Sequence, residues 1–151
     1  MKPLHLETYL PYRLAVASNK VSALIAKAYE SRFDLTTSQW RILAVLSEGQ
    51  SMSQQELVLR TTMDKVMVSR ATATLVARDL VRSRYKASDR RAVQLSLSKA
   101  GFAIVQEVTP MALSLEQELI EAIGVQAAER LESILRKLEE KAMRLTQGHD
   151  V

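Results

Sequence analysis

The stretch from Ser53 to Leu97 constrains the fold of this chain most, because a helical pattern passes directly into a strand pattern. Ser53 and Glu56 stand three residues apart before an apolar run, which is the capping-box pattern of a helix start. We expect a short helix over Gln54–Leu59. The polar run Arg60-Thr61-Thr62 then interrupts it.

A second helix is expected to follow at once and to reach about Arg78. Thr61 and Asp64 repeat the start signal, with the acid in the first turn, where the helix dipole favours it. One face of this helix is predicted to pack inward, and its residues are Val68, Ala71, Thr72 and Leu75. The opposite face carries Lys65, Ser69, Arg70 and Ala73. Such a narrow face with two cations suits insertion into a groove as wide as a helix.

A two-stranded hairpin with a basic tip is expected after this helix. Leu80 and Val81 begin one strand, and the apolar residues of the segment 93–97 alternate with polar ones as in a half-buried strand. Between them, the segment 82–91 is too polar and too charged for a core. Helix, turn, helix and basic hairpin together form the plan of a winged helix-turn-helix.

The pieces of this region resemble the MarR family of bacterial transcriptional regulators in order and spacing. The resemblance rests on Asp64-Lys65-Val66-Met67-Val68-Ser69-Arg70, Leu80-Val81-Arg82, Asp89-Arg90-Arg91 and Leu95-Ser96-Leu97-Ser98-Lys99-Ala100-Gly101. The flanking helices extend it to nearly the whole chain. Asp79 departs from the glycine that is common in the family, although aspartate tolerates the left-handed conformation. Ser88 departs from the more acidic or Pro-containing wing tips that are common there.

The resemblance implies a mainly α fold with a small β-hairpin wing. Residues 1–151 would form a single MarR-type domain, in which residues 35–97 are the winged helix-turn-helix that binds DNA. Residues 1–34 and 98–147 would form the helical dimerisation region. The expected helices outside the winged region are Leu6–Arg32 (regular from about Pro11), Ser38–Glu48 (capped by Thr36 or Thr37), Lys99–Ile123 (capped by Ser98 and bent at Pro110) and Val125–Thr146.

Charge is distributed unevenly along the chain. Residues 60–91 contain nine Lys and Arg against three Asp and Glu, whereas residues 103–151 contain five against nine. Positive charge concentrated on the helix-turn-helix and wing favours a polyanionic partner, here double-stranded DNA. The alternative is that this positive charge simply lies on a solvent-exposed face without a partner.

The terminal helices carry long apolar stripes. They amount to more apolar surface than a small winged domain covers, and exposed apolar area costs about 25 cal/mol per Å². A two-fold homodimer with interdigitated terminal helices would bury it. The alternative is that the long helices simply cover the small sheet of their own chain.

The predicted DNA contacts fall into three groups. Candidates for base edges and nearby phosphates are Thr62, Lys65, Ser69 and Arg70. Candidates for phosphates alone are Gln54, Gln55, Arg82, Arg84 and Lys86. At the wing, either Arg90 or Arg91 would enter the minor groove, and the other would pair with Asp89 to hold the wing in shape. For Arg70 the alternative is an ion pair with Asp64 or Asp79.

The resemblance also implies release from DNA by a small aromatic or phenolic ligand. Family members bind such ligands between the helical dimer region and the winged domain. The candidate residues in the corresponding segments are Tyr9, Tyr12, Arg13, Trp40 and Arg41. Trp40 has the alternative of being a core residue, and Arg41 that of pairing with an acid.

Other classes of protein find little support. A composition of 47% hydrophobic and 25% charged residues indicates an ordered globule, and without cysteine there is neither a disulfide nor a thiolate metal site. The only histidines are His5 and His149, and no phosphate loop or nucleophile motif occurs, so we expect no enzyme, metal or cofactor. With no signal-peptide core or membrane-length apolar run, a cytoplasmic protein is expected. A winged-helix module for protein–protein interaction is the main alternative, and a structural coiled coil is a weaker one.

Overall fold

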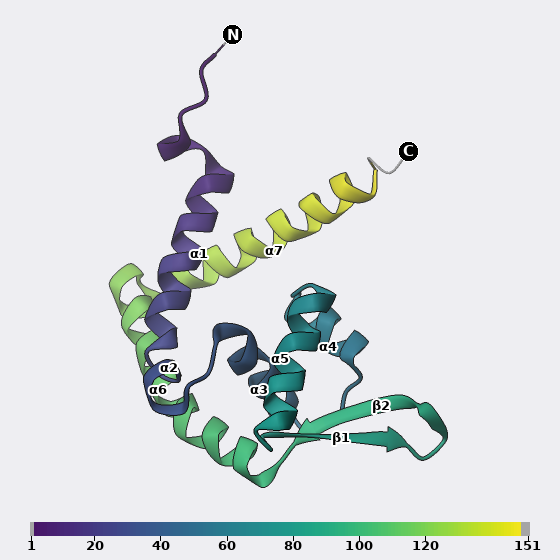
Figure 1. Ribbon diagram of the computed structural model, residues 1–151. Coiled ribbons are helices and arrows are strands. Elements are labelled where there is room, and N and C mark those ends of the chain that lie inside the picture. Colours follow the sequence, from purple (N-terminus) through teal and green to yellow (C-terminus); the bar gives the residue numbers. More distant parts are fainter. Residues whose placement is uncertain (1, 149–151) are drawn as a thin grey trace. The chain divides into compact units, whose positions relative to one another are not determined.

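The computed structural model describes residues 2–148, apart from the side chains of residues 89–91, and is mainly helical with one β-hairpin (Figure 1). Its elements are η1 (Leu6–Thr8), α1 (Leu10–Ala26), α2 (Glu30–Phe33), α3 (Thr37–Ser47), α4 (Gln54–Thr61), α5 (Lys65–Ala77), β1 (Val81–Lys86), β2 (Asp89–Leu97), α6 (Lys99–Ile123) and α7 (Val125–Gln147). The chain divides into two compact units, residues 1–112 and 113–151. The predicted fold class is confirmed.

Helix α4 begins at the predicted capping box. The Glu56 backbone N–H donates to Ser53 Oγ at 3.1 Å, and the Ser53 N–H donates to Glu56 Oε2 at 2.7 Å. The helix runs to Thr61, two residues beyond the expected end at Leu59. It stops at Thr62, whose φ of 54° is left-handed and incompatible with a continuing helix.

Helix α5 begins later than expected. Asp64 is its N-cap, and its Oδ1 accepts the Met67 N–H at 2.8 Å. The expected start at Thr61 was wrong because the Thr61 hydroxyl is already used inside α4, where it donates to the Leu57 carbonyl at 2.6 Å. The predicted inner face is confirmed, since Val68, Ala71, Thr72 and Leu75 are all buried.

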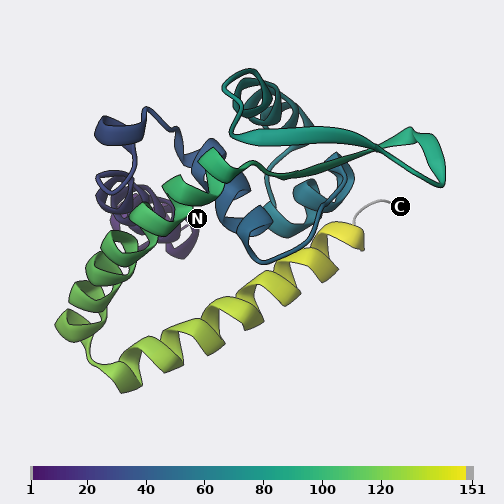
Figure 2. The ribbon, with the colours of Figure 1, turned by 90° about the horizontal axis from the view of Figure 1, so that it is seen from below.

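The hairpin pairs β1 with β2 antiparallel, from Val81 opposite Leu97 to Lys86 opposite Asp89, with one irregularity next to Tyr85. In both views it projects beyond the helices of its unit (Figures 1 and 2). Met52 and Leu95 exchange backbone hydrogen bonds of 2.9 and 2.8 Å, which tie the segment before α4 to the hairpin. The wing is therefore attached to the helix-turn-helix at its base.

The base of the wing also joins α5 to α6. Asp79 adopts the predicted left-handed conformation, with φ 55°. The Ser98 N–H donates to the Leu80 carbonyl at 3.0 Å, and the Ser98 hydroxyl donates to the Asp79 carbonyl at 2.7 Å. Ser98 Oγ in turn accepts the Gly101 N–H at 3.0 Å, so Ser98 caps α6 as predicted. Gly101 packs directly against the Leu80 backbone.

The single N-terminal helix expected over Leu6–Arg32 was wrong, because that segment forms η1, α1 and α2. Tyr9 is an extended N-cap between η1 and α1, and Pro11 lies in the first turn of α1, where its missing N–H is tolerated. After Ala26 the chain tightens into i→i+3 hydrogen bonds up to Tyr29. Tyr29 is 1% exposed, and burial of its side chain accounts for the turn.

Thr36 is the N-cap of helix α3, which resolves the two alternatives left by the sequence. The Gln39 N–H donates to Thr36 Oγ1 at 3.2 Å, and the Thr36 N–H donates to Gln39 Oε1 at 3.1 Å. Before it, α2 ends at Asp34, whose φ is 51°. The buried residues Ile42, Leu43 and Leu46 of α3 pack in the core of the first unit.

Helices α6 and α7 are long and meet at Gly124, which has a φ of 89°. Helix α6 continues through Pro110, and the expected bend there stays a prediction. Within Val125–Gln147 no residue is buried. Nowhere in residues 2–148 is a helix both long and apolar enough to span a membrane.

Candidate nucleic-acid interface

Five of the predicted DNA-binding cations lie on two elements of one unit. Lys65 and Arg70 are exposed on α5, and the other three are exposed on β1: Arg82, Arg84 and Lys86. None of the five side chains forms an ion pair or hydrogen bond with the part of the chain that the structure describes. Their charges are therefore not neutralised there and remain available to an anion.

Two other cations of the basic stretch hold the structure together instead. Arg60 forms an ion pair with Glu48. Arg78 donates to the Phe33 and Asp34 carbonyls, each at 2.7 Å, and so binds the end of α5 to the end of α2. This role could not be predicted from the local pattern, because the accepting carbonyls lie more than forty residues away.

The alternative ion pairs of Arg70 do not occur among the described residues. Asp64 instead caps α5 through its Oδ1, and no described cation lies within ion-pair distance of Asp79. Arg70 occupies the exposed face of α5, next to Ser69, whose side chain is also exposed. An unpaired guanidinium on a helix face has the donor geometry that matches guanine O6 and N7.

A groove of about 850 Å³ separates α5 from the wing and the start of α4. Its lining residues are Ser53, Gln54, Gln55, Ser69, Thr72, Ala73, Val76, Ala77, Ser83, Ala92, Val93 and Leu95. Gln54 Nε2 donates to Thr72 Oγ1 at 3.2 Å, so one predicted phosphate contact is oriented by α5. The groove thus brings together Gln54, Gln55 and Ser69, which come from different helices.

Thr62 lies at the turn between α4 and α5. Its side chain is exposed, and its hydroxyl donates to the Thr61 carbonyl at 2.7 Å. The left-handed backbone at this residue sets the angle at which α5 follows α4. The residue is thus adjacent to the N-terminus of α5, where the sequence placed a DNA contact.

The comparisons with known proteins agree on one family. The model of the MarR family matches residues 33–92, which contain the helix-turn-helix and most of the wing. The MarR-family regulator SPO1453 of Silicibacter pomeroyi is 26% identical, and the match covers 93% of this chain and 99% of that one with a TM-score of 0.78. Over its winged helix-turn-helix, this chain is therefore similar to the MarR family.

Two further relatives extend the comparison. The transcriptional repressor NicR of Pseudomonas putida is 25% identical over 131 residues, which cover 80% of this chain and 83% of NicR. BpsR of Bordetella bronchiseptica, whose DNA binding is regulated by 6-hydroxynicotinic acid, is 25% identical. Its structure matches with a TM-score of 0.83 over 91% of this chain and 98% of BpsR. This chain thus shares the fold of these transcriptional regulators.

At the wing, the side chains of Asp89, Arg90 and Arg91 lie outside the described residues, so their predicted roles stay predictions. The sequence analysis did not single out Tyr85, which precedes Lys86 near the end of β1 and is 71% exposed. A large exposed aromatic ring beside two cations adds apolar surface to the tip of the wing.

The effector candidates of the chain lie in two places. Tyr9, Tyr12 and Arg13 are exposed at the start of α1, and Arg41 is exposed on α3. Trp40 is half-buried, and its ring stacks on that of Tyr29 at 5.5 Å between centroids and 18° between planes.

Tyr29 was missed by the sequence analysis. Its hydroxyl donates to Thr37 Oγ1 at 2.9 Å, which fixes the ring against α3. Tyr29 thus occupies one face of Trp40, so that a ligand would have access only to the remaining surface of the indole. Its position at the end of an apolar helix face resembled ordinary core, and nothing in the local pattern linked it to Trp40.

Proposed function

We propose that this chain is a homodimeric, sequence-specific DNA-binding repressor. Each α5 enters the major groove at one half-site of an inverted-repeat operator, and each wing follows the adjacent backbone. The observation that carries the proposal is the set of five exposed cations on α5 and β1, none of which has a partner in the described structure. A winged-helix module that binds proteins would have no need for this unpaired charge.

Different residues have different tasks in this proposal. Arg70 and Ser69 read base edges, because they lie on the exposed face of α5. Lys65 and Thr62, at the N-terminal end of that helix, reach bases or the nearest phosphates. The remaining contacts neutralise phosphates, and their residues are Gln54, Gln55, Arg82, Arg84 and Lys86. Arg90 or Arg91 enters the minor groove, and the other pairs with Asp89.

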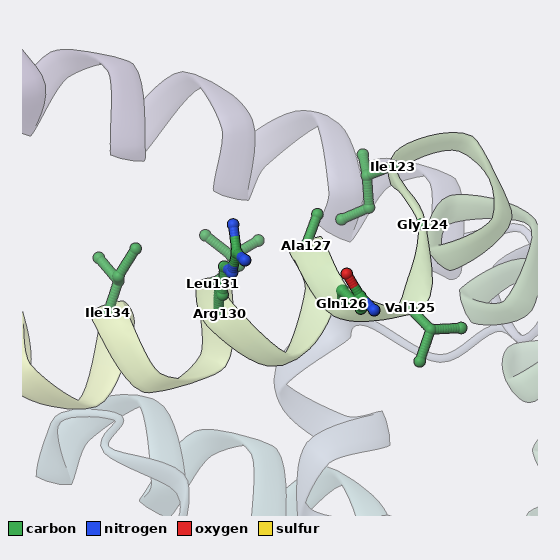
Figure 3. Close-up of a pocket in the computed structure, with 8 residues that line it drawn as sticks. All are labelled: Ile123, Gly124, Val125, Gln126, Ala127, Arg130, Leu131 and Ile134. Carbon is green, nitrogen blue, oxygen red and sulfur yellow. The ribbon is translucent and has the colours of Figure 1, made fainter.

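The apolar seam of α7 supports the homodimer. Leu131, Ile134 and Leu145 are 46, 52 and 50% exposed. In Figure 3, Ile123 at the end of α6 points to the same side as Ala127, Leu131 and Ile134 of α7, and together they help to line an open cavity of about 680 Å³. Exposed apolar rows at this spacing are the pattern of a helix that packs against another helix.

The N-terminal helix supports the same conclusion. Leu10, Leu14 and Val21 of α1 are 54, 37 and 43% exposed, a large apolar surface for a helix of seventeen residues. A second copy that covers these surfaces would gain about 25 cal/mol per Å² of apolar area. In this proposal residues 1–34 and 98–147 form the dimerisation region and residues 35–97 bind DNA.

A small aromatic acid releases the dimer from its operator in this proposal. BpsR, whose DNA binding responds to 6-hydroxynicotinic acid, matches this chain over most of its length. The candidate residues here combine aromatic rings with cations, which suits an aromatic anion: Tyr9, Tyr12, Arg13, Trp40 and Arg41. Release requires that the ligand have a higher affinity for a conformation of the dimer that cannot bind DNA than for the conformation that binds DNA.

We expect 6-hydroxynicotinic acid or a related aromatic acid to quench the single tryptophan and to weaken operator binding over the same concentration range. Trp40 contributes all tryptophan fluorescence, since it is the only tryptophan. The measurement is a fluorescence titration run beside an operator anisotropy titration.

The test variant is Arg13→Gln, which removes one cation from the exposed surface of α1 and should weaken both the quenching and the release from the operator. If a broad panel of aromatic acids caused neither quenching nor release from an operator that the protein binds, the ligand-controlled part of the proposal would be wrong. DNA binding itself would stand.

A further inference from the structure

The first turn of α5 carries two exposed apolar side chains, Val66 and Met67, and Met67 is the less exposed of them at 44%. Val66 is 58% exposed, while Val68 and Leu75 on the opposite side of the helix are each 0% exposed. Ser69, Arg70 and Ala73 follow Val66 at i+3, i+4 and i+7, so they share its face. Val66 therefore lies on the same stripe as the two residues proposed to read bases.

The position of Val66 is fixed by the cap of the helix. Asp64 Oδ1 accepts the Met67 N–H at 2.8 Å, and the Asp64 carbonyl accepts the Val68 N–H at 3.1 Å. These bonds hold the first turn on both sides of Val66. A β-branched side chain in a helix keeps essentially one rotamer, so its two methyl groups project in a defined direction.

Folding alone does not account for valine here. At an exposed helical position alanine favours the helix more than valine does, and more than half of the Val66 surface is not covered by its own chain. Besides the exposed Met67, its neighbours include two cations, Lys65 before it and Arg70 one turn later. The partner that these charges attract is a polyanion with an apolar group in reach of the helix.

We propose that Val66 contacts the C5 methyl group of a thymine in the major groove and so selects an A·T pair at one position of each half-site. Thymine is the one base with a methyl group in that groove, and apolar side chains recognise it by contact. The N-terminal residues of a recognition helix are those that meet base edges. The inference rests on the proposed DNA binding, and it adds a residue that determines specificity without a hydrogen bond.

The test uses the full-length protein and a duplex that it selects from a random pool. Each thymine in the duplex is replaced singly by uracil, which removes only the methyl group, and affinities are measured by fluorescence anisotropy. For the unmodified protein, uracil at one thymine of a half-site should weaken binding about fourfold, the value of one methyl group. For Val66→Ala, the same replacement should cause no further loss.

Leu59→Ala is the control, because it also shortens an exposed apolar side chain, one that is 73% exposed and lies on α4 rather than α5. It should keep the full uracil penalty. The inference is overturned if the unmodified protein binds the selected duplex but tolerates uracil everywhere, or if Val66→Ala retains the penalty. If no duplex is selected from the pool, the proposed function fails and the inference fails with it.

Discussion

Replacing Gly101 with alanine should lower the free energy of unfolding by about 3 kcal/mol, although alanine normally favours a helix over glycine. A Cβ at Gly101 would lie 2.1 Å from the Leu80 carbonyl oxygen, far inside van der Waals contact. That oxygen also accepts the Ser98 N–H, and Ser98 Oγ accepts the N–H of Gly101 itself. The added methyl group would therefore force apart the joint between α5, the wing and α6.

The measurement is urea unfolding followed by circular dichroism, at one fixed protein concentration because dimerisation contributes to apparent stability. Gly148→Ala is the control, since its Cβ would meet the nearest atom, the Arg144 carbonyl oxygen, at 3.4 Å and its φ is −78°. Its stability should change little. If Gly101→Ala were as stable as the unmodified protein, the close approach to Leu80 would not exist in solution.

Arg70→Ala should reduce the preference for operator over random DNA tenfold or more, because one bidentate contact to a guanine contributes about 1–3 kcal/mol of discrimination. Lys86→Ala should weaken binding to both kinds of DNA alike and lower the slope of log affinity against log salt by about two, because each chain of the dimer loses one phosphate contact. Arg70 lies on the exposed face of α5, whereas Lys86 lies at the end of β1. The two substitutions therefore distinguish the recognition of bases from the neutralisation of phosphates.

Parallel titrations with operator and random duplexes at several salt concentrations measure both effects. Arg60→Ala serves as the control, because it removes a cation of the same helix-turn-helix that is already paired with Glu48. Its discrimination should be close to that of the unmodified protein. Equal losses of discrimination in the Arg70 and Lys86 variants would refute this division of roles.

Features with a local cause could be predicted from the sequence. The Ser53 and Thr36 caps depend on side chains three residues away, and the inner face of α5 follows from helical periodicity. The left-handed Asp79 follows from its place in a known family pattern. In each case the information that fixes the structure lies within a few residues of it.

Features with a distant cause could not be predicted. The apolar stripe of the first segment continues past Ala26, but burial of Tyr29 against Trp40 turns the chain there. Arg78 is a cation like its neighbours in sequence, yet its guanidinium is used by two carbonyls near the end of α2. In the sequence Thr61 resembles the N-cap of α5, but its hydroxyl donates to the Leu57 carbonyl within α4.

The same division applies to the candidate interface. Its cations were predicted because the charge of residues 60–91 is so one-sided, but only the structure separates those without a partner from Arg60 and Arg78. The orientation of Gln54 by Thr72 depends on how α4 packs against α5, which no sequence pattern specified. Val66 was passed over because an exposed valine, taken alone, is ordinary.

The number of chains bound to one operator duplex tests the proposed function most directly. Sedimentation equilibrium of the purified protein, alone and with a selected inverted-repeat duplex, gives this number. We expect two chains in the free protein at micromolar concentration and two chains on each duplex, one for each half-site. A single chain in both samples, or a mass that does not change when the duplex is added, would contradict the proposal that paired α5 helices read the DNA.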